Sequence, residues 1–236
     1  MVRPLIAKFG LLALMLAPVQ AAANSVAATQ VAALGTGSSQ WGLQVNLVDV
    51  SPRNATYVVA GPDKGFNNET TLNGSFFIDP QNVTMSTAAG ANSFQMIAFN
   101  DGVGAGTKTR MIFHLNHATA DGWFINVWHW NDNAGGFVFS GGAFFACASA
   151  SCGVVANWHN NRIDFQWNAG NPGHLTLWRT RYINGAPDAT GTVQMFSVNM
   201  PGMQSAVINY AFAGMFASHD PGTSGTLFLD EFVFNR

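Results

Sequence analysis

Short apolar segments with the length of β-strands recur along the chain. Gly, Asn, Asp and Pro separate them, and no window keeps a helical period of apolar residues. The segments predicted as strands are LQVNLVDV, TLNGSFFID, NSFQMIAFN, TRMIFHLNH, DGWFINVWHW, GGFVFSGGAFF, NRIDFQWN, GHLTLWRTRYI, TVQMFSVNM and GTLFLDEFVF. The segment GMQSAVINYAFAGMFA is expected to start as a helical or irregular turn before another strand. So many short strands with frequent turns predict an all-β fold of two packed antiparallel sheets.

Alternation within four of these segments sorts their side chains onto two faces. The predicted inner face consists of Met111, Phe113, Leu115, Trp123, Ile125, Val127, Ile163, Phe165, Trp167, Leu175 and Leu177. If the four strands are neighbours, one outer face carries Arg110, His114, Asn126, Trp128, Trp130, Asp164, Gln166, Thr176 and Trp178. Aromatic rings beside amide and carboxylate groups suit the binding of sugars, so we predict a ligand-binding surface here. In the alternative interpretation, the tryptophans lie under a loop or in a second core layer.

Two adjacent acids interrupt the last apolar strand. Alternation predicts that Asp230 shares one side with Phe228, Phe232 and Phe234, while Glu231 points to the other side or lies at a rim. A carboxylate among phenylalanines needs hydrogen bonds or a metal. We interpret Asp230 as a structural buried acid that accepts backbone N–H groups, with calcium ligation as the alternative.

The first residues have the pattern of an export signal. A basic start, an apolar run and a small-residue tail ending near Ala23 predict a signal peptide over residues 1–23. Residues 24–39 are small and polar and are predicted to be a flexible lead-in, and residues 40–236 a single β-sandwich domain. The mature protein is therefore expected in the periplasm or outside the cell.

Charge limits the range of partners. Charged residues make up 9% of the chain. Loss of Arg3 and Lys8 with the leader, which contains no acid, moves the formal net charge from -2 to -4. No basic patch is expected to displace counterions, so no nucleic-acid partner is predicted. No later apolar segment reaches the roughly 20 residues of a membrane span, and none is predicted.

The two cysteines are close in sequence. Cys147 and Cys152 are the ends of the short segment CASASC, and the predicted export would place them in an oxidising compartment. We predict a disulfide that closes this loop and contributes roughly 2 kcal/mol in the loop-entropy model. The alternative is a free or catalytic thiol.

Metal binding has weaker support in the sequence. His114 and His117 are three residues apart on a predicted strand, which places them on opposite faces without an evident third ligand. If the protein binds a metal, oxygen-rich loops favour calcium as the cofactor. Its candidate ligands are Asp121, Asp132 and Asp220.

Three segments resemble a known superfamily. GSFFIDPQNVTM, RIDFQWNAGNPGHLTLWRT and DPGTSGTLFLDEFVFNR are similar to bacterial secreted domains of the concanavalin A-like, or laminin G-like, jelly-roll type. The resemblance covers Thr56 to Arg236 and implies a two-sheet antiparallel jelly-roll sandwich, used mostly for glycan binding or cell-surface contact, with some glycoside-cleaving members. Asp164 and Asp230 match acidic positions of the pattern, whereas Gln166 stands where a second acid is usual.

Catalysis is less well supported than binding. Glycoside hydrolysis needs two positioned carboxyl groups, but Asp164 is followed two residues later by Gln166, and Asp230 and Glu231 point apart. We therefore expect a secreted, non-catalytic, lectin-like domain that binds a carbohydrate or cell-surface polysaccharide. The alternatives are a structural or adhesive protein of the envelope or matrix, and a glycoside hydrolase or polysaccharide lyase.

Overall fold

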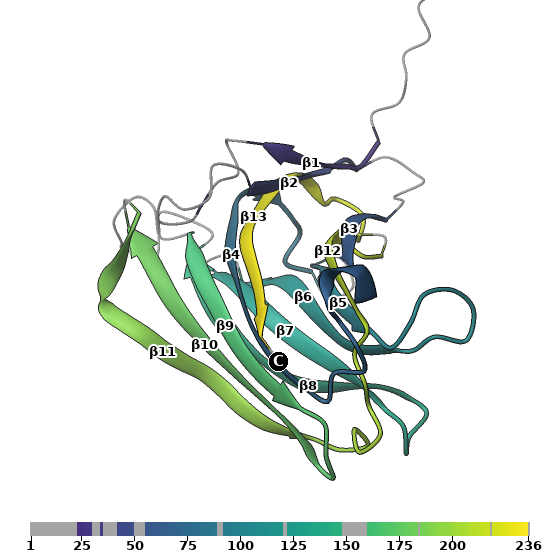
Figure 1. The fold of residues 1–236 in the computed structure, drawn as a ribbon. Coiled ribbons are helices and arrows are strands. Elements are labelled where there is room, and N and C mark those ends of the chain that lie inside the picture. The colour runs from purple at the N-terminus through teal and green to yellow at the C-terminus, as the bar shows by residue number, and fades with distance from the viewer. Residues whose placement is uncertain are drawn as a thin grey trace, which may run out of the picture.

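The computed structural model describes residues 23–29, 34, 42–49, 55–88, 92–119, 122–147, 160–183, 185–217 and 219–235. These residues form two antiparallel β-sheets that pack face to face as two layers (Figure 1). The prediction of an all-β fold of two antiparallel sheets packed as a sandwich is confirmed.

The larger sheet, called sheet A, has seven strands in the order β1-β2-β13-β4-β9-β10-β11. The C-terminal strand thus lies inside the sheet, between two strands from the N-terminal half of the chain. The strands are β1 (Ser25–Thr29), β2 (Gly42–Leu47), β4 (Thr71–Thr84), β9 (Asn161–Asn168), β10 (Gly173–Ile183), β11 (Ala186–Met200) and β13 (Ser224–Asn235).

The smaller sheet, called sheet B, has six strands in the order β3-β12-β5-β6-β7-β8. Figure 1 shows it passing behind the strands of sheet A. A short 3-10 helix, η1 (Pro62–Lys64), follows its first strand. The strands are β3 (Thr56–Ala60), β5 (Ser93–Asn100), β6 (Thr109–Thr119), β7 (Gly122–Asn131), β8 (Gly136–Cys147) and β12 (Tyr210–Met215).

The hydrophobic core fills the space between the two sheets. All residues predicted for the inner face are buried in it, so this part of the alternation is confirmed. Burial of a large apolar side chain contributes about 1.5–3 kcal/mol, which fixes the face that each strand turns inward. The confirmed residues are Met111, Phe113, Leu115, Trp123, Ile125, Val127, Ile163, Phe165, Trp167, Leu175 and Leu177.

Two short strands lie outside the predicted segments. Residues Ser25–Thr29, within the predicted flexible lead-in, form β1 and pair with β2. Residues Thr56–Ala60 form β3 at the edge of sheet B and pair with β12. Neither strand has the alternation of a half-buried strand, because exposed positions dominate both.

Strand β13 changes the face that it turns toward the core. Leu227 and Leu229 belong to the core, and further along Phe232 and Phe234 pack against it. Between them the pairing with β4 shifts by one residue in a β-bulge, where Glu231 has a φ of 45°. An extra residue in one strand reverses the alternation that follows. The structure therefore corrects the predicted single side for Phe228, Asp230, Phe232 and Phe234.

No helix among the described residues is long and apolar enough to cross a membrane. The predicted signal peptide, except for Ala23, lies outside the described part of the chain. The same holds for Cys152 and for the side chain of Cys147, so the disulfide stays a prediction.

Candidate functional site

The residues predicted to share one outer face lie on two different sheets. Strands β6 and β7 belong to sheet B, whereas β9 and β10 belong to sheet A. The prediction of one continuous surface is therefore wrong, because alternation tells which side of a strand a residue occupies but not which sheet the strand joins. Sheet A carries Asp164, Gln166, Thr176 and Trp178, and sheet B carries Arg110, His114, Asn126, Trp128 and Trp130.

The outer face of sheet A has an open groove of about 680 Å³. Residues of β4, β9, β10, β11 and β13 line it. Three predicted ligand-binding residues, Asp164, Gln166 and Trp178, are among them. This groove is the candidate functional site.

Strand pairing places these three side chains next to one another. Asp164 on β9 lies opposite Trp178 on β10 and, on its other side, opposite Ser75 on β4. Gln166, two residues further along β9, lies opposite Asn73. Directly opposite residues on one face have Cβ atoms about 5 Å apart. An aromatic ring, a carboxylate and two amides therefore form one compact surface.

An ion pair between Arg162 and Asp164 is part of the lining of the groove. The Arg162 guanidinium donates to Oδ1 of Asp164 from Nη2 at 2.7 Å and from Nε at 3.1 Å. The two side chains are 41% and 30% exposed. Such an exposed pair contributes little to stability, but it fixes the positions of both charged groups. The sequence predicted Asp164 but not Arg162.

Glu231 is a second carboxylate that lines the groove. The bulge of β13 brings it there, since a bulge re-aims the side chain that it carries. A φ of 45° lies in the left-handed region that residues other than glycine rarely adopt. No local pattern in the sequence predicted a bulge, so Glu231 was expected only on the opposite side from Asp230 or at a rim.

Hydroxyl and aromatic groups complete the lining. Thr180 and Thr192 are hydrogen-bonded to each other through their hydroxyls at 2.7 Å. The Tyr182 ring packs edge-on against Phe77, with ring centroids 4.8 Å apart. Sugar ligands need ring faces for stacking and neutral donors and acceptors for hydroxyls, and this lining supplies both.

The outer face of sheet B carries aromatic side chains that pack in pairs across β7 and β8. Ring centroids are 5.8, 5.4 and 5.4 Å apart in the three pairs, all in T-shaped arrangements. We call this surface the aromatic ridge, formed by Phe124 with Phe144, Trp128 with Phe139, and Trp130 with Phe137. The three phenylalanines of β8 are 38–49% exposed, so this face is not a second core layer.

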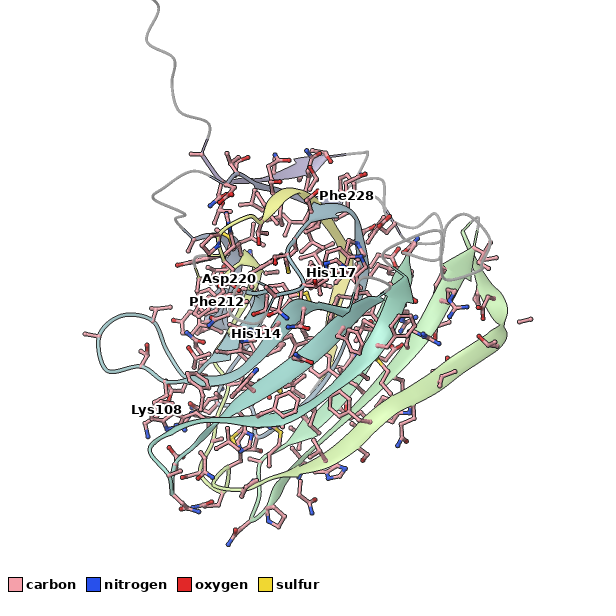
Figure 2. All side chains as sticks on the ribbon, turned by 180° about the vertical axis from the view of Figure 1, so that it is seen from behind. Lys108, His114, His117, Phe212, Asp220 and Phe228 are labelled. Atoms are coloured by element: carbon pink, nitrogen blue, oxygen red, sulfur yellow. The ribbon has the colours of Figure 1, made fainter. Side chains whose placement is uncertain are left out.

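His114 lies beside the ridge on the same face. Its ring is 6.2 Å from that of Trp128, and Figure 2 shows it close to Asp220. Burial lowers the pKa of His114 to about 4, although the Asp220 carboxylate acts in the opposite direction. His117 stacks on the buried Trp123 of the inner face, as its odd spacing from His114 on the strand requires.

The other two predicted residues on sheet B have structural contacts. Arg110 is buried and forms ion pairs with Asp101 at 2.8 Å and Asp132 at 3.0 Å. The side chain of Asn126 leans over Gly142, where an added Cβ would be 2.1 Å from its Oδ1. Neither residue lies on the groove of sheet A.

Two of the three aspartates predicted as calcium ligands are described, and they have different partners. Asp121 is outside the described residues. Asp132 lies in the β7–β8 turn and accepts hydrogen bonds from Lys108 at 2.7 Å and from Arg110. Asp220 accepts the backbone N–H of Ser93. Among the described residues, no group of three or more His, Cys, Asp or Glu side chains could hold a metal ion.

Asp132 fits an ion-pair role better than a metal role. Burial raises the pKa of its carboxyl, but the hydrogen bond from Lys108 and the charge of Arg110 outweigh this and lower the pKa. Both cations occupy oxygens that a calcium ion would need. Lys108 and Arg110 therefore supply the positive charges that Asp132 pairs with.

Asp230 is buried, 3% exposed, and lies opposite Phe77. Its Oδ2 accepts the N–H of Leu34 and its Oδ1 the N–H of Glu231, both at 2.7 Å. Hydrogen bonds of this kind satisfy a carboxylate that burial would otherwise destabilise. The bond to Glu231 also fixes the backbone of the bulge.

No protein-family model and no curated protein matches the sequence. Among solved structures, the chain is similar to the legume lectin-like domain from Entamoeba histolytica, with 9% identity, a TM-score of 0.41, and coverage of 83% of this chain and 84% of that one. It is similar to the alginate lyase from Klebsiella pneumoniae, with 12% identity, a TM-score of 0.41, and coverage of 83% and 74%. It is also similar to the CBM2 module of the Lactobacillus casei BL23 phage J-1 evolved Dit, with 13% identity, a TM-score of 0.38, and coverage of 81% and 75%. At these identities the likeness concerns the fold alone.

Proposed function

We propose that the protein is a secreted carbohydrate-binding module and that the groove of sheet A is its binding site. The observation that carries this proposal is the position of Trp178, Asp164 and Gln166 side by side in one open groove. The indole face offers a stacking surface for a sugar ring, and the carboxylate and amide offer partners for its hydroxyls. The expected partner is a glycan or a cell-surface polysaccharide.

Two tryptophans on opposite faces of the sandwich provide the test. Trp178→Ala is expected to weaken glycan binding at least tenfold, since truncation of a central aromatic side chain to alanine often costs 2 kcal/mol or more of binding free energy. Trp128→Ala, on the aromatic ridge, removes the same side chain from the other sheet and should leave binding within about twofold. Binding is measured by a glycan array of the mature protein, followed by titration of each hit.

The opposite result would identify the other face as the binding site. Loss of binding in Trp128→Ala with retention in Trp178→Ala would place the ligand on the aromatic ridge and refute the groove. Each titration is repeated with a chelator. Loss of binding on chelation would support a calcium-dependent site and bring Asp121 and Asp220 forward as candidate ligands.

A glycoside hydrolase is the second candidate, because Asp164 and Glu231 both line the groove. Retaining and inverting glycosidases use two carboxyl groups on either side of the scissile bond. Incubation of each bound polysaccharide, with detection of new reducing ends, tests for this reaction. Release that is abolished in Glu231→Gln would favour hydrolysis, and intact polymer would favour binding alone.

A further inference from the structure

We propose that Ser197, His174 and Asn199, on the outer face of sheet A, form an acyl-transfer centre that hydrolyses small O-acyl esters of a glycan. The choice of a glycan ester rests on the proposed carbohydrate-binding function, whereas the chemistry of the three side chains does not. Their hydrogen bonds carry the inference, because they have the order of a nucleophile, a general base and a group that orients the base.

Strands β10 and β11 bring the three side chains together. The apolar residues between them on each strand pack in or against the core, so the alternate residues point outward. In the antiparallel register His174 lies opposite Asn199, and Thr176 lies opposite Ser197. Ser197 and Asn199 are exposed, so a ligand can reach them.

The imidazole of His174 lies between the other two side chains. Its Nε2 is 2.8 Å from Oγ of Ser197, and its Nδ1 is 3.2 Å from Oδ1 of Asn199. A neutral imidazole with its proton on Nδ1 donates to the Asn199 oxygen and accepts the Ser197 hydroxyl at Nε2. This tautomer directs a base at the serine proton, as in an activated serine nucleophile.

Thr176 adds a second hydroxyl to the network. Its Oγ1 is 2.9 Å from Oγ of Ser197 and 3.2 Å from Nε2 of His174. When Thr176 donates to Ser197, the Ser197 proton remains directed at Nε2. Thr176 is buried, whereas Ser197 is exposed. Ser197 is therefore the hydroxyl that an ester can reach.

The tetrahedral intermediate of acyl transfer needs a donor for its oxygen. Strand β11 ends the order of sheet A in the part of the chain that the structure describes, so alternate backbone N–H groups of β11 point away from β10. Since these groups recur at every second residue, at least one belongs to Ser197 or to a residue next to it. This N–H is the donor that we assign to the oxyanion.

The proposed reaction has two steps that use the same base. Oγ of Ser197 bonds to the acyl carbon and its proton passes to Nε2 of His174; the bond to the alcohol oxygen then breaks, and the alcohol leaves with that proton. Nε2 next takes a proton from a water molecule whose oxygen bonds to the acyl carbon, and Ser197 leaves with that proton. Ester and water become carboxylic acid and alcohol.

The position of Ser197 indicates the kind of ester. In the strand pairing Thr176 lies between Ser197 and Gln166, and Gln166 lines the groove of sheet A. Two strand spacings are roughly 10 Å, so a glycan in the groove would bring a substituent of a neighbouring sugar to Ser197. The hydrogen-bonded neighbours of Ser197 are polar, which suits an acetyl group better than a long alkyl chain.

Two kinds of substrate test the proposal on the mature chain. Hydrolysis of p-nitrophenyl acetate reports the chemistry alone, and release of acetate from acetylated xylan and acetylated glucomannan reports the glycan ester. A fluorophosphonate probe followed by peptide mass spectrometry identifies the reacting serine. We expect the label on Ser197. Ser197→Ala should lose the label and lower both rates by about a hundredfold or more.

Variants of the other two residues separate catalysis from folding. His174→Ala should lower kcat by about a hundredfold or more, and added imidazole should restore part of it by replacing the missing base. Asn199→Asp keeps an acceptor for the Nδ1 proton and should retain activity. Asn199→Leu removes that acceptor and should lower kcat about tenfold or more with little change in KM.

Ser140→Ala is the matched control. Oγ of Ser140 also lies 2.8 Å from a histidine nitrogen, Nδ1 of His129, but this ring is 1% exposed. The variant should keep both rates within about twofold. Trp178→Ala should slow acetate release from the glycans about tenfold more than it slows hydrolysis of p-nitrophenyl acetate.

The outcomes separate this inference from the proposed function. No label on Ser197, or rates that Ser197→Ala leaves unchanged, overturns the acyl-transfer centre, and Trp178-dependent glycan binding would still stand. Labelled Ser197 with hydrolysis of p-nitrophenyl acetate but no acetate release from either polymer overturns the glycan ester as the substrate. Glycan binding that does not depend on Trp178 refutes the proposed function and the choice of ester, while the label on Ser197 still decides the chemistry.

Discussion

At the scale of single residues, Asp230 is the carboxylate whose contacts have the clearest consequence for stability. Asp230→Ala removes the acceptor of the Leu34 and Glu231 N–H groups. A buried N–H without an acceptor costs about 1–3 kcal/mol, so we expect a loss of roughly 2 kcal/mol or more and a clearly lower Tm. Calorimetry or thermal denaturation followed by circular dichroism measures it.

A surface carboxylate serves as the control for Asp230. Asp63 forms an exposed ion pair with Lys64 at 3.4 Å, and Asp63→Ala should change stability by less than about 0.5 kcal/mol. Equal Tm values for the two variants would show that the buried contacts of Asp230 contribute nothing measurable.

Burial of individual residues was predictable, but the partners of polar residues were not. Met111, Phe113 and Leu115 alternate with more polar neighbours, and this pattern alone places them in the core. Asp132 was considered a metal ligand because its loop is rich in oxygen atoms. Its actual partners include Arg110, which is 22 residues away in sequence, so local composition could not reveal the ion pair.

At the scale of elements, the β10–β11 hairpin depends on an ion pair that is buried on both sides. Arg181 Nη1 lies 3.1 Å from Asp188 Oδ2, and the two side chains are 7% and 8% exposed. Burial raises the pKa of the Asp188 carboxyl, but hydrogen bonds from Thr190 and the charge of Arg181 outweigh this and lower the pKa. The pair therefore favours the ionised carboxylate in the folded state.

Removal of one member of this pair should be strongly destabilising. Asp188→Asn removes the negative charge that pairs with the buried Arg181 guanidinium, and we expect a loss of about 3 kcal/mol. The double variant Arg181→Leu with Asp188→Leu should recover part of this loss, because no buried charge remains. Urea denaturation of the three proteins measures the effect, and a double variant less stable than Asp188→Asn would contradict the explanation.

The two strands that could not be predicted from the sequence were missed for the same physical reason. Strands β1 and β3 are short and expose most of their side chains, so burial leaves no alternating pattern in them. The bulge in β13 was missed for a different reason. It interrupts a regular alternation without a glycine or proline at Glu231, and only the pairing with β4 shows it.

At the scale of the whole molecule, the class of fold was predictable and the assignment of strands to sheets was not. Strand length and turn spacing are local properties, and they predicted a two-sheet sandwich. The order of strands within each sheet depends on long-range pairing, such as that of β13 with both β2 and β4. The predicted binding surface was therefore divided between two outer faces, and the groove brought together Asp164, Gln166 and Trp178 but not Trp128.

Below pH 7, two histidines and two aspartates among the described residues should make stability depend on pH. All four have lowered pKa values, so acidification destabilises the folded protein through each of them. Burial lowers the pKa of His114 to about 4 and also lowers that of His129. Between pH 6.5 and 4 the unfolded chain therefore binds protons that the folded protein does not, so acidification favours unfolding. For His114 this amounts to a loss on the order of 3 kcal/mol. Asp132 and Asp188 have lowered pKa values, and their contribution is present above about pH 4 and is lost below it.

We therefore expect the free energy of unfolding to rise steadily from pH 3 to pH 7, without a maximum near pH 5. Urea denaturation at unit pH intervals gives this profile. His114→Gln removes one of the two described histidines with lowered pKa values and should flatten the profile between pH 4 and 6.5 without changing its slope below pH 4. His174→Gln, on the outer face of sheet A, is the matched control. If the two variants give the same profile, the protonation of His114 is not coupled to folding, and the acid sensitivity of the sandwich must come from the aspartates and His129.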